Sequence, residues 1–389
     1  MKKIAFITES VYPYFFGGQE KMIYDYATIL AQDHSIKIVT MKQWDGSSTM
    51  VKEGVSYVGI CARLPIYKKN GKRNSIASLW LGIKTFFWVL CCDEDILFIN
   101  VFPYFPLIFA RMAIFFKKKK PVIIGGWAEY WGKEYWKKYY PCHWWMGVFL
   151  ERASYAVIDH IVVISQFTRN KIVRAFGTGT KKMTILAPAY IKTNIINSVS
   201  VHEKKYDIIY YGRIIAHKHV EHIVNVVEKS LLQGTPLRAL IIGDGPDKKH
   251  ITDMIAIKKI EKNIDLMDFI DDYAELITQI KSAKVMIQPS EREGFGITVV
   301  EANACGLPVF VISYPDNASA ELVKDGVNGY VCVDEHDLYQ KVYDVLCDSN
   351  SHERLTTLVR GAITESEPYA FGSMQKKIVA FFTQEKFNT

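Results

Sequence analysis

The sequence alternates short apolar runs with helical patterns, and this alternation limits the fold more than any other feature. The chain opens with an apolar run at residues 4–7, a Gly17-Gly18 turn, a helical pattern over residues 20–30 and a second apolar run at 36–39. Parallel strands need a long crossover between them, and a helix commonly supplies it. The sequence therefore predicts an α/β fold with a parallel sheet and helices on its faces.

The alternation starts again in the second half of the chain. Residues 194–205, NIINSVSVHEKK, lose the apolar periodicity and are predicted to form a linker. A chain of 389 residues is long for one domain, so we expect two doubly wound domains, residues 1–198 and 199–368, followed by a final segment, 369–389. Further strands are expected at 96–100, 122–124, 161–164, 208–211, 239–242, 265–269, 285–288 and 309–312.

The two halves differ in charge and in aromatic content. Residues 1–200 carry 27 Lys and Arg against 13 Asp and Glu, a net of +14, whereas the remainder carries 21 against 28, a net of −7. This contrast predicts that the two halves meet different surroundings. The first half also contains all eight tryptophans: Trp44, Trp80, Trp88, Trp127, Trp131, Trp136, Trp144 and Trp145.

Two apolar segments in the basic half, residues 76–92 and 101–116, are candidates for membrane contact. Neither reaches the roughly 20 apolar residues that a spanning helix requires. A helix buried against the sheet and an interfacial helix both fit the pattern. Basic residues beside Trp-rich apolar surface favour a peripheral protein on an anionic lipid surface. The basic residues are Lys68, Lys69, Lys72 and Arg73 before the first segment and the four lysines at 117–120 after the second.

The cysteines and the N-terminal residues predict a compartment. The seven cysteines form no C-x-x-C pair, and no histidine-rich spacing indicates a zinc site. The apolar run at residues 4–7 is too short for the core of a signal peptide. We therefore expect free thiols in a reducing cytoplasm, and a cytoplasmic protein that is peripheral at the membrane.

The segment REGFGITVVEANACGLP, residues 292–308, contains the strongest candidate site. Glu293 precedes a Gly294-Phe295-Gly296-Ile297 turn, and Glu301 follows about five residues into the predicted helix, roughly 7 Å along its axis. The free N–H groups at a helix start favour negative charge. A sugar at Glu293, a ribose at Glu301 and phosphates between them would suit this arrangement. An acid–base pair on a polysaccharide, as in glycosidases, is the competing hypothesis.

Other strand ends of the second half supply cations and glycines. Arg213 and Lys218 follow the strand at 208–211, and a guanidinium with an ammonium suits a diphosphate. A solvated basic loop is the alternative for either residue alone. Gly243 would let the backbone approach a ligand, and Asp268 with Phe269 would edge a base pocket. Ligands of doubly wound sheets bind at such strand ends.

The spacing of Glu293 and Glu301, Glu-x7-Glu within PSEREGFGITVVEANACGLPV, resembles the signature of the retaining nucleotide-sugar glycosyltransferases of family 4. That family has the GT-B fold, in which two Rossmann-like doubly wound domains face each other across a cleft. The resemblance covers most of the chain. Its other motifs are Gly17-Gly18, DHIVVIS at 159–165, Gly212-Arg213 with Lys218, GDGP at 243–246 and DGVNGY at 325–330.

The resemblance implies a role for each donor-side residue. Arg213 and Lys218 would stabilise the leaving nucleoside diphosphate, so no cofactor and no divalent metal are expected. Glu293 would bind the donor sugar beside the turn at 294–297, and Glu301 would hold the ribose. Gly18, with Gly17, would approach the phosphates or the acceptor from the facing domain.

The resemblance also implies how the reaction is divided between the domains. Residues 1–198 would bind the acceptor, residues 199–368 would bind the nucleotide sugar, and a helix in 369–389 would cross back to the first domain. The expected reaction is retaining transfer of a hexose-type sugar to a hydroxyl of a glycan or lipid-linked acceptor. The family commonly has a histidine in a V-x-x-x-H-G segment. Here PVIIGGWAEYWG places Trp127 near that position, so Trp127 and Glu129 become the acceptor-side candidates.

Three alternatives remain at the level of sequence. A metal site at Asp93-Glu94-Asp95 is disfavoured, because these residues precede a strand and are expected to form a solvated loop. A GT-B enzyme acting on a nucleic acid would explain the basic half, but the tryptophans and apolar segments fit a lipid better. A sugar-nucleotide-binding protein without catalysis would explain Trp127, although Arg213 and Glu293 argue against it.

Overall fold

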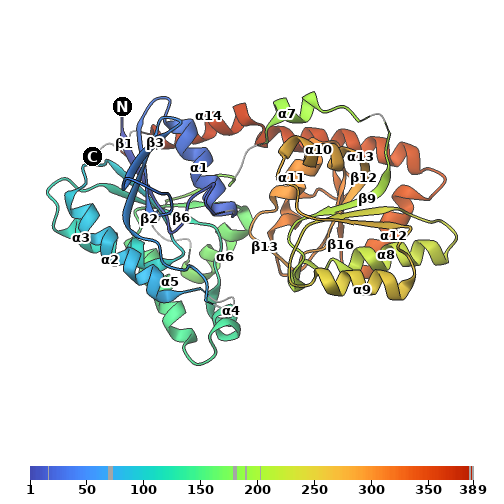
Figure 1. Ribbon diagram of the computed structural model, residues 1–389, viewed down its shortest axis with the longest axis horizontal. Helices are drawn as coiled ribbons and strands as arrows, with labels where there is room; N and C mark the ends of the chain where they lie inside the picture. The colour runs from blue at the N-terminus through green and yellow to red at the C-terminus, as the bar shows by residue number, and fades with distance from the viewer. Residues whose placement is uncertain are drawn as a thin grey trace. The chain divides into compact units, whose positions relative to one another are not determined.

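The computed structural model describes residues 1–15, 17–68, 73–177, 182–188, 191–201, 203–384 and 387 (Figure 1). The chain forms two compact units. Unit 1 comprises Met1–Ala189 and Met374–Thr389, and unit 2 comprises Tyr190–Ser373. Each unit contains a mostly parallel sheet with helices against it, which confirms the predicted α/β class.

The sheet of unit 1 has the strand order β3-β4-β2-β1-β5-β6-β7-β8. Its central strands β1 and β5 are almost entirely buried, because both faces of a parallel sheet are covered by helices. At one edge, β3 pairs antiparallel with β4. The strands are β1 (Lys3–Ile7), β2 (Ser35–Lys42), β3 (Thr49–Lys52), β4 (Val55–Ala62), β5 (Ile96–Asn100), β6 (Val122–Trp127), β7 (His160–Val163) and β8 (Lys182–Ile185).

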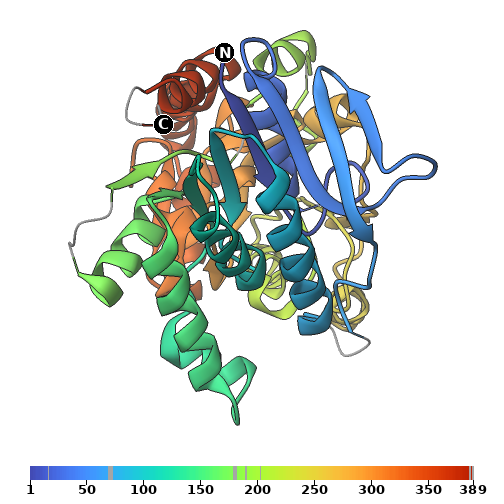
Figure 2. The ribbon, with the colours of Figure 1, turned by 90° about the vertical axis from the view of Figure 1, so that its left-hand side faces the viewer.

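The helices of unit 1 include both apolar segments of the sequence, which form α2 and α3. These two helices lie side by side, and α3 also packs on α5 (Figure 2). Within the described ranges, no helix combines the length and the apolar character needed to cross a membrane. The helices are α1 (Gly18–Leu30), α2 (Ser75–Cys91), α3 (Tyr104–Phe115), α4 (Gly132–Tyr139), α5 (Trp144–Val157), α6 (Gln166–Phe176) and most of α14 (Phe371–Phe382).

Residues near the end of the chain complete the core of unit 1. The ring of Phe382 lies 5.9 Å from that of Phe6 on β1 and 6.1 Å from that of Phe98 on β5. The Nζ of Lys2 donates to the carbonyl oxygens of Phe382 and Gln384, at 3.2 and 2.9 Å. The centre of this sheet is therefore covered by residues from both ends of the sequence.

The acidic run before β5 is a loop, as the sequence predicts, but of its three residues only Asp93 is exposed. Asp93 pairs with Lys3, and Asp95 pairs with Lys119. Glu94 is 2% exposed and its Oε1 lies 2.7 Å from the Nζ of Lys37. Basic residues on neighbouring segments neutralise the run at the amino end of the sheet, opposite to the edge where such sheets bind ligands.

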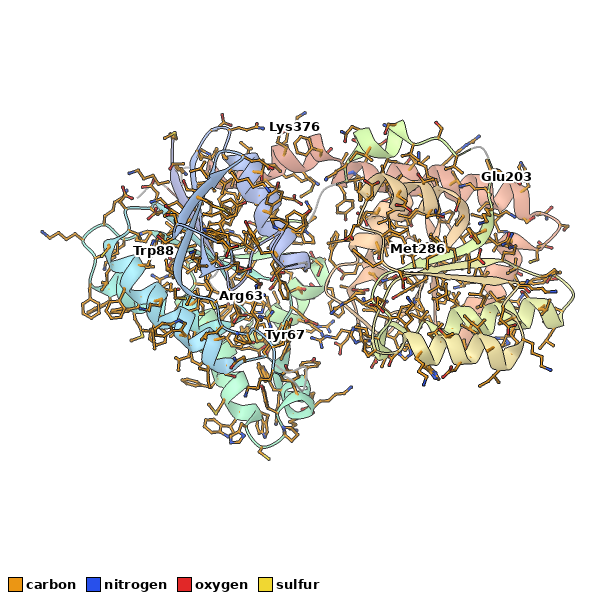
Figure 3. All side chains as sticks on the ribbon, in the orientation of Figure 1. Arg63, Tyr67, Trp88, Glu203, Met286 and Lys376 are labelled. Atoms are coloured by element: carbon orange, nitrogen blue, oxygen red, sulfur yellow. The ribbon has the colours of Figure 1, made fainter. Side chains whose placement is uncertain are left out.

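The sheet of unit 2 is entirely parallel, with the order β11-β10-β9-β12-β14-β16. Met286 on β12 is fully buried within it (Figure 3). A small separate pair joins β13 (Arg292–Glu293) to β15 (Asp316–Asn317). The strands of the main sheet are β9 (Tyr206–Tyr211), β10 (Ala239–Ile242), β11 (Ile264–Met267), β12 (Ala283–Gln288), β14 (Val309–Ile312) and β16 (Gly329–Cys332).

The predicted linker is partly helical. Thr193–Ser198 form α7, which packs on α10. The Nζ of Lys281 at the end of α10 donates to the carbonyl oxygens of Ile196 and Val199, at 2.6 and 2.7 Å. A helix of six residues shows too little periodicity to be recognised from sequence. The other helices of unit 2 are α8 (Glu221–Leu232), α9 (Lys248–Lys258), α10 (Tyr273–Lys281), α11 (Ile297–Ala304), α12 (Glu335–Leu346) and α13 (Ser351–Ser366).

Candidate functional site

The strand order of unit 2 identifies where a ligand site should form. From β9 the chain proceeds outward through β10 and β11, and it then returns to the other side of β9 as β12, β14 and β16. Doubly wound sheets bind ligands at the carboxyl ends of the strands where the order reverses. Here the reversal lies between β9 and β12. Arg213 and Lys218 follow β9, and Glu293 follows β12.

Lys218 and Glu293 meet at this reversal. Lys218 ends a short 3-10 helix, Ala216–Lys218, and its Nζ forms an ion pair with the Oε1 of Glu293. The same oxygen accepts a hydrogen bond of 2.6 Å from the Nε2 of Gln288. The two ion-paired side chains are 13% and 15% exposed. The Glu293 carboxylate is therefore held in place by two contacts. The side chains of Glu293 and Lys218 both remain partly accessible at the same point of the sheet edge.

Arg213 adds a second cation to the loop after β9. Its side chain is exposed, and its carbonyl oxygen accepts a hydrogen bond of 2.9 Å from the hydroxyl of Tyr210. A backbone hydrogen bond joins this loop to the loop after β12: the N–H of Glu291 donates to the carbonyl oxygen of His217 at 2.8 Å. The loops after β9 and β12 thus form one connected structure.

Two glycines of the predicted site have conformations that side chains would not permit. Gly243 has φ +154, and an added Cβ would lie 1.9 Å from the carbonyl oxygen of Gly212. Gly296 has φ +105 and precedes α11, where an added Cβ would lie 2.6 Å from the Cβ of Ser319. Both positions therefore require glycine, which allows close approach of backbone segments at the strand ends.

The residues around Gly296 fix the start of α11. Gly294 is half-buried, and Ile297 is the first residue of the helix, which ends at Ala304. Phe295 is 7% exposed, with its ring 5.7 Å from that of Tyr369. Phe295 and the buried Gly296 thus anchor the turn in the core, while Gly294 and Ile297 remain partly accessible.

Glu301 lies on α11 beside the Tyr273 phenol and the Cys305 thiol, both of which are uncharged at neutral pH. Its Oε1 accepts a hydrogen bond of 3.2 Å from the hydroxyl of Tyr273. Burial and the charge of Glu301 raise the pKa of Tyr273 well above its ordinary value. Burial, with the same charge, raises the pKa of the Cys305 thiol to about 12. The phenol therefore remains a hydrogen-bond donor to the carboxylate at neutral pH.

The remaining donor-side candidates lie away from the reversal. Asp268 and Phe269 follow β11, which is two strands from β9 in the sheet. Asp268 forms an ion pair with Lys248, and Phe269 is 65% exposed. Both are accessible at the same edge of the sheet as Arg213, because the carboxyl ends of parallel strands share that edge.

Among the described residues, His219, Glu221 and His222 are the one group of three metal-capable side chains with suitable spacing. Their candidate ligand atoms lie within 4.8 Å of one another. The Nδ1 of His219 is 2.7 Å from the Oε1 of Glu221, and the Nδ1 of His222 is 3.3 Å from the Oε2 of Glu335. Burial lowers the pKa of His222, so its contact with Glu335 is not a pair of opposite charges at neutral pH, and its Nε2 lies 3.4 Å from the hydroxyl of Tyr314.

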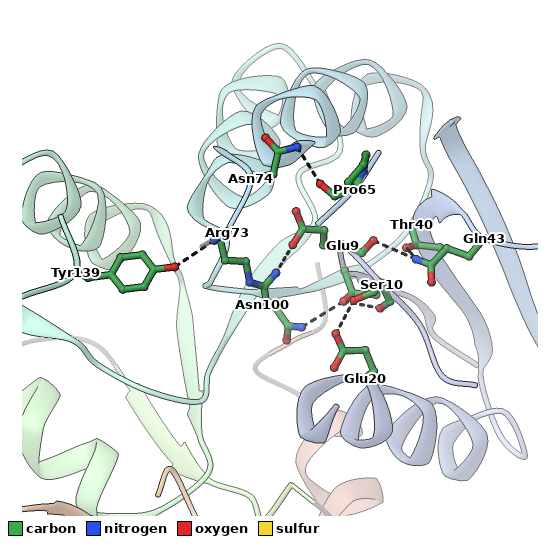
Figure 4. Close-up of polar contacts among 11 residues, drawn as sticks. Glu9, Ser10, Glu20, Thr40, Gln43, Pro65, Arg73, Asn74, Asn100 and Tyr139 are labelled. Carbon is green, nitrogen blue, oxygen red and sulfur yellow. Dashed lines mark hydrogen bonds and ion pairs between the residues drawn. The ribbon is translucent and has the colours of Figure 1, made fainter. Parts of the chain in front are cut away.

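Unit 1 has its own reversal of strand order, between β1 and β5. A polar network occupies the carboxyl end of β1 (Figure 4). Arg73 forms an ion pair with Glu9, and the hydroxyl of Ser10 donates to Glu20. Burial raises the pKa of Glu9 to about 7, although the charge of Arg73 opposes this rise. Sequence reasoning did not identify Glu9, because no local pattern indicates its pairing with Arg73.

The glycine turn of unit 1 borders this network. Gly17 is the N-cap of α1 and Gly18 is its first residue. A Cβ added at Gly17 would lie 2.3 Å from the Oε2 of Glu20. The turn therefore passes close to a carboxylate that is 6% exposed.

The two acceptor-side candidates occupy different environments. Trp127 is 1% exposed and belongs to the core of unit 1, where its Nε1 donates to the carbonyl oxygen of Glu129 at 3.0 Å. Glu129 is half-buried, and its Oε2 accepts a hydrogen bond of 3.1 Å from the Nε1 of Trp131. The indole of Trp127 thus contributes to core packing, and Glu129 is the more accessible of the two.

The helical face of unit 1 exposes aromatic residues beside lysines. Phe87 on α2 is 60% exposed, and Phe115 and Phe116 at the end of α3 are 78% and 68% exposed. Their rings are linked through Phe86, which lies 5.4 Å from Phe87 and 6.3 Å from Phe116. We call Phe86, Phe87, Phe115 and Phe116 the aromatic patch. Lys118 and Lys120 beside it are exposed, whereas the predicted Lys69 and Lys72 lie outside the described residues.

The fold and the two strand reversals define a class of protein. Solved structures of the GT-B glycosyltransferases share the fold over the whole chain. A sucrose-phosphate synthase from Thermosynechococcus elongatus gives a TM-score of 0.76 at 14% identity, covering 100% of both chains. Anabaena Alr3699/HepE in complex with UDP gives 0.72 at 16%, covering 98% of this chain and 99% of that one. WaaG, a glycosyltransferase involved in lipopolysaccharide biosynthesis, gives 0.70 at 15%, covering 98% and 99%. The fold is therefore GT-B, with two Rossmann-like domains.

The sequence comparison finds a similarity within unit 2. The family model described as glycosyl transferases group 1 matches residues 191–360. The alpha-monoglucosyldiacylglycerol synthase of Acholeplasma laidlawii is 29% identical over 174 residues, 45% of this chain and 42% of that protein. The poly(glycerol-phosphate) alpha-glucosyltransferase of Bacillus subtilis is 27% identical over 161 residues, 41% and 23%. The matches span less than half of the length of these relatives.

Proposed function

We propose that the protein is a retaining glycosyltransferase of family 4, which moves a hexose-type sugar from a nucleoside-diphosphate sugar to a hydroxyl of a glycan or lipid-linked acceptor. The observation that carries the proposal is the ion pair of Lys218 and Glu293 at the strand reversal of unit 2. It brings a phosphate-binding cation and a hydroxyl-binding carboxylate to one point. The match of residues 191–360 to the glycosyl transferases group 1 supports it.

In the proposed mechanism, unit 2 binds the donor along α11, between Glu293 before the helix and Glu301 within it. Glu293 accepts hydrogen bonds from hydroxyls of the sugar, and Glu301 accepts them from the ribose. The phosphates lie near the start of α11, where free N–H groups and the helix dipole favour negative charge. Tyr273 orients the carboxylate of Glu301 through its hydroxyl. The backbone at Gly294 and Gly296 gives the diphosphate access to the helix start.

Transfer then requires stabilisation of the leaving group. The bond between the anomeric carbon and the diphosphate oxygen breaks, and its electron pair stays on the diphosphate. Lys218 and Arg213 stabilise this charge by electrostatic preorganisation, which is often the largest contribution to catalysis. The acceptor oxygen bonds to the anomeric carbon on the face that the diphosphate leaves, and its proton passes to the diphosphate. No metal ion is required by this scheme.

The aromatic patch supports a membrane surface as the place of action. Exposed phenylalanines next to lysines suit the boundary of an anionic bilayer, because apolar rings enter the acyl region and lysines contact headgroups. The amphipathic acceptor would be held at that surface, and the enzyme would act as a peripheral protein in the cytoplasm. A double-stranded nucleic acid would contact the lysines, but its bases are stacked on one another and would not contact the exposed phenylalanines.

Product formation by the purified protein tests the proposal. The protein would be incubated with UDP, GDP, ADP and dTDP sugars and a lipid extract, and a thermal-shift screen would identify which donor stabilises it. We expect one class of donor to bind and its sugar to appear in the lipid fraction with retained anomeric configuration. Binding of donors without transfer or hydrolysis would contradict the proposal and support an inactive sugar-nucleotide-binding protein.

A further inference from the structure

Unit 1 contains a cavity of about 280 Å³ at its strand reversal. Glu9 contributes from the segment after β1, and residues 102–105 contribute from the segment after β5. The first turn of α2 and the hairpin of α4 and α5 form the remaining walls. The cavity thus lies where a doubly wound sheet binds ligands, and its size is near that of small-molecule sites. Aromatic side chains dominate its walls: Phe102, Tyr104, Phe105, Trp136, Tyr139 and Tyr140.

A few polar groups are set among these rings. Arg73 and Glu9 line the cavity as an ion pair, and Glu9 is 3% exposed. Asn74 caps α2 by accepting a hydrogen bond of 3.2 Å from the N–H of Ile76. The Ser78 side chain also lines the cavity and is 5% exposed, and its hydroxyl has no hydrogen-bond partner among the described residues. The oxygen has less than 1 Å² of accessible surface, so a ligand contacts it only when the serine side chain rotates toward the cavity. A buried hydroxyl is normally satisfied, so a ligand that supplies a partner would favour that rotamer.

The mixture of aromatic walls and polar groups selects one ligand chemistry. A sugar ring has apolar C–H faces that pack on aromatic rings, and its hydroxyls both donate and accept hydrogen bonds. A hydrocarbon chain would leave the ion pair of Glu9 and Arg73 without polar contacts, which costs free energy. Lys68 also lines the cavity and would attract a phosphate, but the phosphate would then lie against the carboxylate of Glu9. The sugar ring is therefore the chemistry that satisfies all of these groups.

Exposed apolar residues flank the cavity. Met146 lines it and is 45% exposed, and its neighbours Trp145 and Phe149 on α5 are 57% and 64% exposed. On the other side, Ile76 follows the lining residue Ser75 and is 69% exposed. A ligand with a sugar in the cavity could therefore place an apolar tail on this surface.

We propose that the cavity binds the sugar ring of a glycolipid acceptor. The inference rests on the proposed function and narrows it, since the acceptor then already carries a sugar. A reaction that attaches a sugar to the lipid must precede the reaction of this protein. Ser78 and Glu9 contact hydroxyls of that ring, and the aromatic walls pack on its faces.

Ser78 allows a test with a matched control on the same helix. Because its hydroxyl has no partner in the described protein, Ser78→Ala should leave folding intact. The control is Thr85→Val, since Thr85 on α2 is also buried with an unpartnered hydroxyl but does not line the cavity. Octyl α-glucoside, octyl β-glucoside and octyl β-galactoside serve as probes, with octanol as the probe that lacks a sugar. Affinity for the full chain is measured by tryptophan fluorescence without donor.

We expect at least one octyl glycoside to bind more tightly than octanol. Ser78→Ala should weaken that binding about 2- to 10-fold, the range for one lost hydrogen bond, and Thr85→Val should not change it. Glu9→Gln should weaken it further. Equal binding of octanol, equal affinity in Ser78→Ala, or no binding of any glycoside would overturn the inference. If these results hold while no sugar is transferred, the proposed function fails and the sugar site stands. If transfer occurs without them, the sugar site alone fails.

Discussion

Lys218 and Glu293 form an ion pair although they are 75 positions apart in the sequence. The pair forms because β9 and β12 are neighbours in the sheet, so the loops at their carboxyl ends meet. We expect Glu293→Gln to lower kcat/KM for sugar transfer at least about 100-fold, because the amide lacks the charge that fixes the sugar and Lys218. Glu291→Gln is the control, since Glu291 lies two residues away with a side chain 49% exposed. Activity of the Glu293 variant within twofold of wild type would refute its role.

Glu301 should determine the affinity for the nucleotide part of the donor. Glu301→Gln removes charged hydrogen bonds to ribose hydroxyls, so we expect the Kd of the nucleoside diphosphate to rise roughly 10-fold or more. Tyr273→Phe removes only the supporting hydroxyl, whose oxygen lies 3.2 Å from Oε1 of Glu301, and should have a smaller effect. Isothermal titration calorimetry measures both variants. An unchanged Kd in Glu301→Gln would show that the ribose binds elsewhere.

Transfer should persist when divalent metal ions are removed. In the proposed mechanism, Arg213 and Lys218 supply the positive charge that a metal ion would otherwise provide to the diphosphate. We therefore expect activity in excess EDTA to remain within about twofold of the untreated enzyme. His222→Ala is the companion variant, because His222 belongs to the group that could hold a metal. Loss of activity in EDTA, restored by one divalent metal, would contradict this expectation.

The aromatic patch should control binding to anionic lipid. Replacing Phe115 and Phe116 by serine removes two large exposed rings, so less protein should sediment with anionic liposomes. The control is the replacement of Leu232 and Ile257 of unit 2 by serine. These two apolar residues are 80% and 79% exposed and do not belong to the aromatic patch. If the two double variants sedimented equally with the liposomes, the aromatic patch would not be part of the membrane-binding surface. Tight binding of DNA without binding of liposomes would favour a nucleic acid acceptor.

Glu151 should make the stability of unit 1 depend on pH. It is fully buried on α5, and its carboxylate accepts hydrogen bonds from the N–H groups of Trp131 and Gly132. Burial raises the pKa of Glu151 from 4.5 to about 7. Between these values the folded protein holds a proton that the unfolded chain has lost. The contribution to stability is therefore greatest below pH 4.5 and is lost as the pH rises through 7.

The variant Glu151→Gln isolates this contribution. The amide cannot ionise, so the melting temperature of the variant should rise relative to that of wild type as the pH is raised from about 5 to 8. The corresponding difference in the free energy of unfolding between the two proteins should change by about 1–3 kcal/mol over this range. Thermal melts at several pH values measure it. Parallel pH profiles of the two proteins would show that Glu151 does not change its ionisation in this range.

The sequence predicts the buried strands well, and the reason is physical. Strands covered on both faces are continuous apolar runs, so Ile96–Asn100, Ala239–Ile242 and Val309–Ile312 match their predicted bounds. The β3–β4 hairpin was missed because β3 is largely exposed and its residues are mixed in polarity. The sequence predicts a linker where α7 forms, because six residues are too few to show periodicity.

For the candidate site, local sequence patterns predict the position of each residue along the chain but not the contacts between residues. Arg213, Lys218 and Glu293 could be placed at strand ends from local patterns, but their meeting depends on the order of strands in the sheet. The ion pair of Arg73 with Glu9 joins residues 64 positions apart, with no motif to signal it. The buried state of Trp127 likewise follows from how β6 packs in unit 1 and not from its neighbours in sequence.

The packing of Phe382 on Phe6 and Phe98 has a consequence for biosynthesis. A ribosome makes the first 189 residues, then all of unit 2, and only afterwards the residues that cover the centre of the first sheet. Unit 2 can fold during translation as soon as it emerges. The core of unit 1 stays incomplete until its last residues are synthesised. The unit that is synthesised first is therefore the unit that completes its folding last.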